Sequence, residues 1–143
     1  MTTVPIEVPK RPTLTHEHSY LRTHRISGRW LRFRLFGEDA ALRAQALSSK
    51  TGRAGKTLVK QGSLRIAQVA LRRGSQLGSH QIAGAVSVHV LRGQLRLATS
   101  DGKLMLEQGD LVALDTGVFH SAEAMSDCVV LVTMAMQYAQ VAS

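Results

Sequence analysis

Two stretches of the sequence decide the fold. They read GSQLGSHQIAGAVSVHVLRG at residues 74–93 and GDLVALDTGVFH at residues 109–120. In the first, valines at every second position from 86 to 90 alternate with Ser87 and His89. This period of two predicts a strand with one apolar face turned inward, and it puts His89 on the opposite, outer face.

The same pattern continues outward through the second half of the chain. Eight glycines separate short segments rich in Val, Leu and Ile, which is typical of an all-β sandwich or barrel. Asp101-Gly102 lies between two such segments and has the residues of a tight hairpin turn. The predicted strands are Leu64–Leu71, Ala85–Leu91, Gln94–Thr99, Lys103–Glu107, Leu111–Leu114, Val118–Ala124 and Cys128–Met136.

The first half of the chain differs in charge. Residues 1–60 contain 12 Lys or Arg and 4 Asp or Glu, whereas residues 61–143 contain 6 of each, so the formal net charge of +8 lies entirely in the first part. We expect three regions, which are a basic segment at 1–36 that is partly disordered or an edge strand, a helix and loop at 37–62, and a barrel at 63–138.

Local patterns refine the first two regions. Ala40–Leu47 supplies strong helix formers after two carboxylates, which predicts one short helix. Thr51–Lys56 reads as a loop, and Thr57–Val59 as a short edge strand. In Arg29–Phe36, aromatic and aliphatic residues alternate with arginines, which favours a first strand whose apolar side packs on the barrel.

Length and composition exclude several classes of protein. With 143 residues and 44% apolar residues, the chain is one globular domain. The longest apolar stretch is far shorter than the roughly 20 residues that span a bilayer, and no secretory signal is visible, so we expect a cytoplasmic protein without membrane contact. The single cysteine, Cys128, forms no internal disulfide and is expected to be a buried, inert thiol.

The spacing of the two deciding stretches resembles the motifs of the cupin family. The first family motif is Gly, five residues, His-x-His, three or four residues, Glu, six residues and Gly. The second is Gly, five residues, Pro-x-Gly, two residues and His. Gly74 to His80, Val86 to Gly93, and Gly109 through Gly117 to His120 match these spacings. The resemblance covers about residues 64–136 and implies a double-stranded β-helix, or jelly-roll barrel.

The resemblance also implies where a metal would lie. Metal-binding cupins hold a divalent ion with two histidines, a glutamate and a third histidine, and the corresponding positions here are His80, Ile82, Val86 and His120. Two of the four have no lone pair, so His80 and His120 would hold Zn, Fe, Ni or Cu only weakly unless Gln81, Asp115 or a ligand completed the shell.

Without a metal, the two imidazoles are expected to act as polar groups in an apolar pocket. A neutral imidazole donates and accepts hydrogen bonds and can orient a small acid, phenol or carbonyl compound. The expected lining is Ile82, Val86, Val88, Phe119 and Met134, which favours an apolar or amphipathic molecule unless these residues pack solidly. The sequence therefore predicts small-molecule binding or sensing rather than catalysis.

Two other functions remain open. One is a metal-dependent cupin oxygenase, isomerase or lyase with a reduced ligand set. The other is nucleic-acid binding through the basic first half, where Arg29–Phe36 interleaves aromatic rings with arginines. Gly55-Lys56-Thr57 ends like a phosphate-binding loop, but Lys50 stands where that motif needs its first glycine. The resemblance also implies a homodimer.

Overall fold

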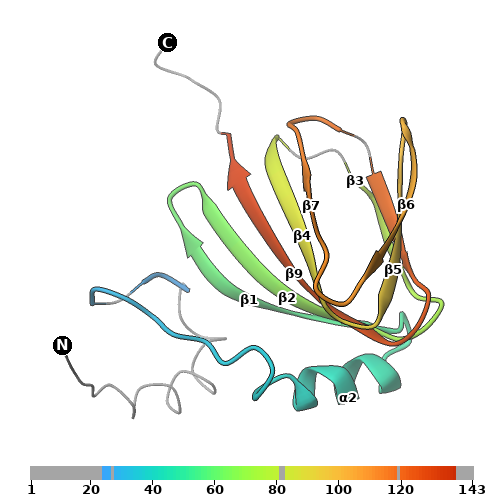
Figure 1. The fold of residues 1–143 in the computed structure, drawn as a ribbon. Helices are drawn as coiled ribbons and strands as arrows, with labels where there is room; N and C mark the ends of the chain where they lie inside the picture. Colours follow the sequence, from blue (N-terminus) through green and yellow to red (C-terminus); the bar gives the residue numbers. More distant parts are fainter. Residues whose placement is uncertain (1–23, 27, 81–82, 119, 138–143) are drawn as a thin grey trace.

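Nine strands in two facing sheets, with one helix outside them, make up the described part of the protein (Figure 1). The computed structural model describes residues 24–26, 28–80, 83–118 and 120–137. The elements are α2 (Ala40–Ser48), β1 (Arg53–Gln61), β2 (Leu64–Leu71), β3 (Gln76–His80), β4 (Gly84–Arg92), β5 (Gln94–Thr99), β6 (Gly102–Glu107), β7 (Leu111–Leu114), β8 (His120–Ala124) and β9 (Cys128–Met136).

Both sheets are antiparallel. Sheet A has five strands in the order β1-β2-β9-β4-β7, and sheet B has four in the order β3-β8-β5-β6. Strands distant in the sequence are therefore neighbours, since β2 pairs with β9 and β3 with β8. This double-sheet arrangement is a jelly roll, as the sequence predicts.

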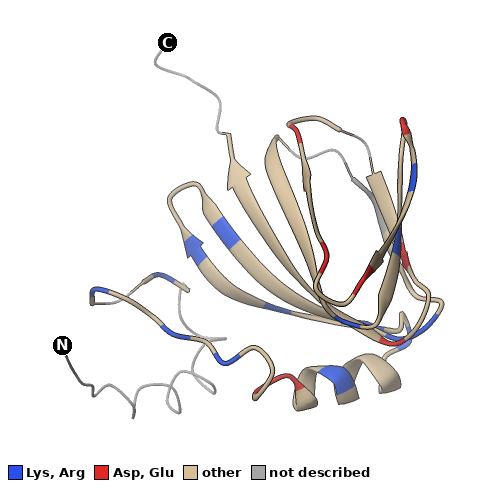
Figure 2. Cartoon of the chain, in the orientation of Figure 1, with Lys and Arg blue, Asp and Glu red and all other residues tan. Residues whose placement is uncertain are grey.

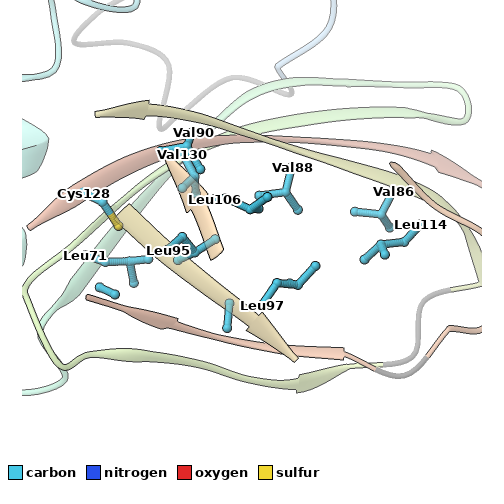
Figure 3. Close-up of a cluster of buried hydrophobic side chains, with 12 residues drawn as sticks. Leu71, Val86, Val88, Val90, Leu95, Leu97, Leu106, Leu114, Cys128 and Val130 are labelled. Carbon is cyan, nitrogen blue, oxygen red and sulfur yellow. The ribbon is translucent and has the colours of Figure 1, made fainter. Parts of the chain in front are cut away.

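The main hydrophobic core lies between the two sheets (Figure 3). Alternation in β4 explains its composition, because Val86, Val88 and Val90 are buried while Ser87 and His89 on the other face are partly exposed. The buried members of the cluster are Leu71, Val86, Val88, Val90, Leu95, Leu97, Leu106, Leu114, Ala122, Ala124, Cys128 and Val130.

A second, smaller cluster lies on the outer face of sheet A. Helix α2 contributes Leu42 and Ala46, which pack with Leu91 and Val129 from the sheet and with Leu35. Residues 24–36 and α2, which we call the covering layer, lie on this same side of the sheet (Figure 1). The layer explains why Leu91 is buried although it faces away from the main core.

Polar contacts join the covering layer to sheet A. The buried Gln68 side chain donates from Nε2 to the carbonyl oxygen of Leu35 at 3.1 Å. The carboxylate of Asp39, which is 1% exposed, accepts from Arg92 Nε at 2.6 Å. At the edge of β1, the amide of Lys60 donates to the carbonyl oxygen of His24 at 2.8 Å. A buried carboxylate needs such a partner because burial removes its hydration.

The seven strands expected in the second half and the short helix are all present, with ends shifted by one or two residues. The predicted hairpin is confirmed as well. Thr99 pairs with Gly102, so β5 and β6 are joined by Ser100 and Asp101.

Three expectations for local structure were wrong. The stretch 51–56, predicted as a loop, contributes residues from Arg53 onward to β1, which is much longer than the expected Thr57–Val59 strand. Strand β3 has no counterpart among the predicted segments. The predicted strand at 29–36 is absent, because this segment lies on the face of sheet A without joining either ladder. The expectation of disorder before residue 24 falls outside the described residues.

Two glycines of the matching motifs have positive φ but different surroundings. Gly74 has φ of +86°, and a Cβ there would meet no atom within 4 Å. Gly93 has φ of +81°, and a Cβ there would lie 2.8 Å from Cys128 Cβ and 2.9 Å from Ser126 Oγ, and would overlap the carbonyl oxygen of Asp127. Gly93 therefore lets the β4–β5 connection pass against the start of β9.

Candidate functional site

Among the histidines whose burial the structure describes, His120 is the buried one. It begins β8, where residues 120, 122 and 124 are buried and the intervening ones partly exposed, so its side chain lies on the inner face of sheet B with 9% exposure. Its Nδ1 lies 3.1 Å from the carbonyl oxygen of Val118. Because a carbonyl oxygen can only accept, Nδ1 donates this hydrogen bond.

His80 is placed beside His120 by the backbone. It is the last residue of β3, and the β3–β8 register pairs its Cα with that of His120. The register shifts between Leu77 and His80, so the pairing resumes at this position after an irregularity. Two histidines that are 40 positions apart in the sequence are thus direct cross-strand partners.

The expected apolar wall comes from sheet A. Val86 and Val88 belong to the main core, and Met134 packs against it from β9, where it pairs with Val86. Leu114 pairs with Val86 from the other side. Ile82 and Phe119, which the sequence also assigns to the lining, lie outside the described residues.

Sequence reasoning missed two further residues of this part of the barrel. Thr99 pairs with His120 on the other side of β8, and its hydroxyl takes part in the β5–β6 turn through Gly102 and Asp101. Leu104 pairs with the buried Leu97 yet is 46% exposed, because β6 forms the edge of sheet B. No local pattern in the sequence singles out either residue, because both follow from the register of β5 with β6 and β8.

The residues at the four metal-motif positions do not fit a cupin metal centre. Val86 is buried and apolar, and Ile82 has no lone pair, so two of the four positions cannot donate. Asp115, one candidate to complete the shell, is exposed and accepts the amide of Thr116 at 2.7 Å. Within the described ranges no three His, Cys, Asp or Glu side chains gather in a group that could hold an ion.

The remaining candidates of the sequence lie elsewhere. His89 is on the outer face of sheet A between Leu111 and Leu131, as its parity predicts. Gly55-Lys56-Thr57 is part of β1 and precedes no helix, which excludes a phosphate-binding loop. Cys128 is buried, and burial, with a smaller contribution from the charge of Asp127, raises its pKa to about 12. The thiol is therefore protonated and inert at neutral pH, as expected.

Comparison with solved structures identifies the fold. A cupin superfamily protein from Desulfitobacterium hafniense matches with a TM-score of 0.61 and 13% identity over 80% of this chain and 97% of its own. Salicylate 1,2-dioxygenase from Pseudaminobacter salicylatoxidans matches with a TM-score of 0.63 and 19% identity over 72% of this chain but only 34% of its own. A conserved Streptococcus pyogenes protein of unknown function matches with a TM-score of 0.59 and 21% identity over 64% of this chain and 80% of its own.

These similarities show that the chain has the cupin jelly-roll fold. No protein-family model matches the sequence, and neither does any curated protein. Among the described residues, no helix is both long and apolar enough to cross a membrane.

Proposed function

We propose that this protein binds a small organic molecule inside the barrel, with the imidazoles of His80 and His120 as its polar contacts. The observation that carries the proposal is the β3–β8 register, which makes the two histidines direct partners. His120 faces the apolar interior, where an imidazole can orient a polar group of a ligand.

The surroundings define the chemical class of the ligand. The neighbours from sheet A are Val86, Val88, Leu114 and Met134, which offer no hydrogen bonds from their side chains. A suitable ligand is thus mostly apolar and carries one or two polar groups at one end. A carboxylate, a phenol or a carbonyl would each pair with imidazole. Salicylate combines the first two on one ring, and salicylate 1,2-dioxygenase shares this fold.

Binding is favoured over catalysis by the groups around the histidines. General acid–base catalysis by histidine commonly uses a carboxylate to orient and tune the ring. Glu123, the described carboxylate nearest in sequence to His120, lies on the other face of β8, where it forms an ion pair with Arg96. Asp115 is exposed and accepts the amide of Thr116. A metal-dependent oxygenase, isomerase or lyase would need ligands that Ile82 and Val86 cannot provide.

The proposal is tested by calorimetric titration of the full chain with salicylate, benzoate and phenol. We expect saturable binding of at least one, weakened about tenfold or more in His120→Ala, because a hydrogen bond to a charged group is worth about 1.5–3 kcal/mol. His89→Ala is the matched control, since His89 lies on the outer face of sheet A, and its affinity should equal that of the wild type. Failure of all three compounds to bind at about 10 mM, where millimolar affinities are still detected, would overturn the proposal.

Metal analysis distinguishes the proposed binding function from the alternative, a metal-dependent enzyme. Treatment with a chelator should leave salicylate binding unchanged. A transition metal that is retained stoichiometrically by the wild type and lost in the His80→Ala, His120→Ala double variant would instead favour the metal-dependent enzyme.

We also propose that the protein pairs with a second copy through the part of sheet A that the covering layer leaves open. Strand β7 is the edge of this sheet, and its Leu111 is 60% exposed on the outer face beside His89. An open edge next to an exposed leucine invites pairing with an identical edge about a twofold axis. Light scattering should show a dimer for the wild type and a monomer for Leu111→Glu. A wild-type monomer would refute this assignment.

A further inference from the structure

An aromatic and arginine stripe runs along the outside of the covering layer. Between residues 30 and 36, side chains at odd positions are half-buried, with Leu35 packed against the cluster on sheet A, while those at even positions are exposed. The even positions are Trp30, Arg32, Arg34 and Phe36, which we call the outer stripe. Trp30 is 58% and Phe36 53% exposed. Large aromatic side chains are seldom left this open without a partner, which makes the outer stripe a candidate binding surface.

The charge of this surface has one sign. Residues 24–36 contain four arginines, at 25, 29, 32 and 34, and no acidic residue. All four are exposed. Figure 2 shows blue but no red along this segment. The ion pairs found among the described residues lie elsewhere, since they join Asp39 to Arg43 and Arg92, and Glu123 to Arg96. The complement to such a surface is a polyanion.

We propose that the outer stripe binds single-stranded nucleic acid. Trp30 offers a ring for stacking on an unpaired base, and Phe36 offers a second ring at the other end of the stripe. The guanidinium carbon of Arg92 lies 5.1 Å from the centroid of the Phe36 ring. Arg32 and Arg34 lie between the rings and contact phosphates. From Trp30 to Phe36 an extended chain reaches at most about 20 Å, enough for a few stacked nucleotides.

A membrane surface fits the same residues less well. Segments that insert into a bilayer surface bury a broad apolar face among the lipid chains. Here that face is already used, because Leu35 packs against the cluster beneath α2, and Leu31 and Phe33 share its half-buried side. The segment 1–23 does not supply the opposite charge either, since it has three basic and two acidic residues. Duplex DNA is excluded as the main ligand because its bases are already stacked.

The chain contains a built-in reporter, because Trp30 is its only tryptophan. Stacking of a base on the indole should quench its fluorescence on addition of a 15-nucleotide oligothymidylate to the full chain. The affinity should fall with salt with a slope of about 0.7 for each phosphate contact. Arg32→Gln with Arg34→Gln should weaken binding and lower the slope by about 1.4, which corresponds to two contacts.

Arg73→Gln with Lys103→Gln is the matched control. It removes the same charge at exposed positions outside the covering layer and should leave both quenching and affinity within about twofold. The tryptophan variant Trp30→Ala, followed by anisotropy of a labelled oligothymidylate, should bind about tenfold more weakly or worse, because base stacking on an aromatic ring is lost.

Three outcomes would overturn the proposal. One is an unquenched Trp30 at saturating oligothymidylate. Another is equal weakening in the outer-stripe double variant and its control, which would indicate attraction by net charge alone. The last is a blue shift with anionic phosphatidylserine vesicles together with no response to the oligonucleotide, which would assign the surface to lipid. Binding of heparin without quenching is expected and supports the role of the bases, because heparin has charge but no aromatic rings.

Discussion

Replacing Gly93 by alanine tests the β4–β5 connection. At +81° the backbone of Gly93 is left-handed, which costs an ordinary residue about 1–2 kcal/mol. A Cβ would also overlap the carbonyl oxygen of Asp127 and lie 2.8 Å from Cys128 Cβ. Because one neighbour is a backbone carbonyl and the other is the buried first residue of β9, relief requires a backbone shift. We expect a total loss of about 4 kcal/mol or more, in the range that signals a specific structural conflict.

The control for this prediction is Gly74→Ala. Gly74 has nearly the same φ, +86°, but no atom within 4 Å of a Cβ, so only the backbone cost of about 1–2 kcal/mol should remain. Urea unfolding of both variants, followed by circular dichroism, gives the two losses directly. Equal losses would show that Gly93 does not pack against β9 and would refute the reasoning.

Three further predictions concern buried groups. Stability should fall as the pH rises from 9 to about 12, because in this range the Cys128 thiol loses its proton in the unfolded chain but keeps it in the folded one. Cys128→Ala should remove this contribution to the pH dependence of the free energy of unfolding. Asp39→Asn should cost about 2–3 kcal/mol by urea unfolding, whereas Arg43→Gln, 3.7 Å from the same carboxylate and half-exposed, should cost at most about 0.5 kcal/mol. Val88→Asp should abolish cooperative unfolding, since it buries an unpaired charge.

Alternation and glycine spacing predict most of the barrel because those strands carry their own signal. The sequences of strands β1 and β3 contain little of this signal. Arg53–Gln61 begins with arginine, alanine, glycine and lysine, and Gln76–His80 contains a glycine, so local propensity favours a loop in both. Each becomes a strand because it pairs with β2 or β8, a contact that no local window of sequence contains.

The segment 29–36 shows the opposite error. Its period of two correctly predicts that Leu31, Phe33 and Leu35 are partly buried while the arginines between them are exposed, and Leu35 packs on the sheet. An extended chain lying on a sheet alternates just as a strand does, so periodicity cannot tell whether the backbone joins the ladder. For the candidate site, motif spacing predicted that His80 and His120 would meet, whereas Thr99 and Leu104 follow only from the observed register.

The covering layer should separate from sheet A more readily than the strands of the sheet separate from one another. Its polar links to the sheet include Gln68 to Leu35, Asp39 to Arg92 and Lys60 to His24, whereas every strand of sheet A pairs with at least one neighbour through a ladder of backbone hydrogen bonds. Local opening needs less free energy where fewer buried contacts must separate. Amide hydrogens of α2 should therefore exchange with deuterium well before those of β2 and β9, through transient release of the helix while the barrel stays closed.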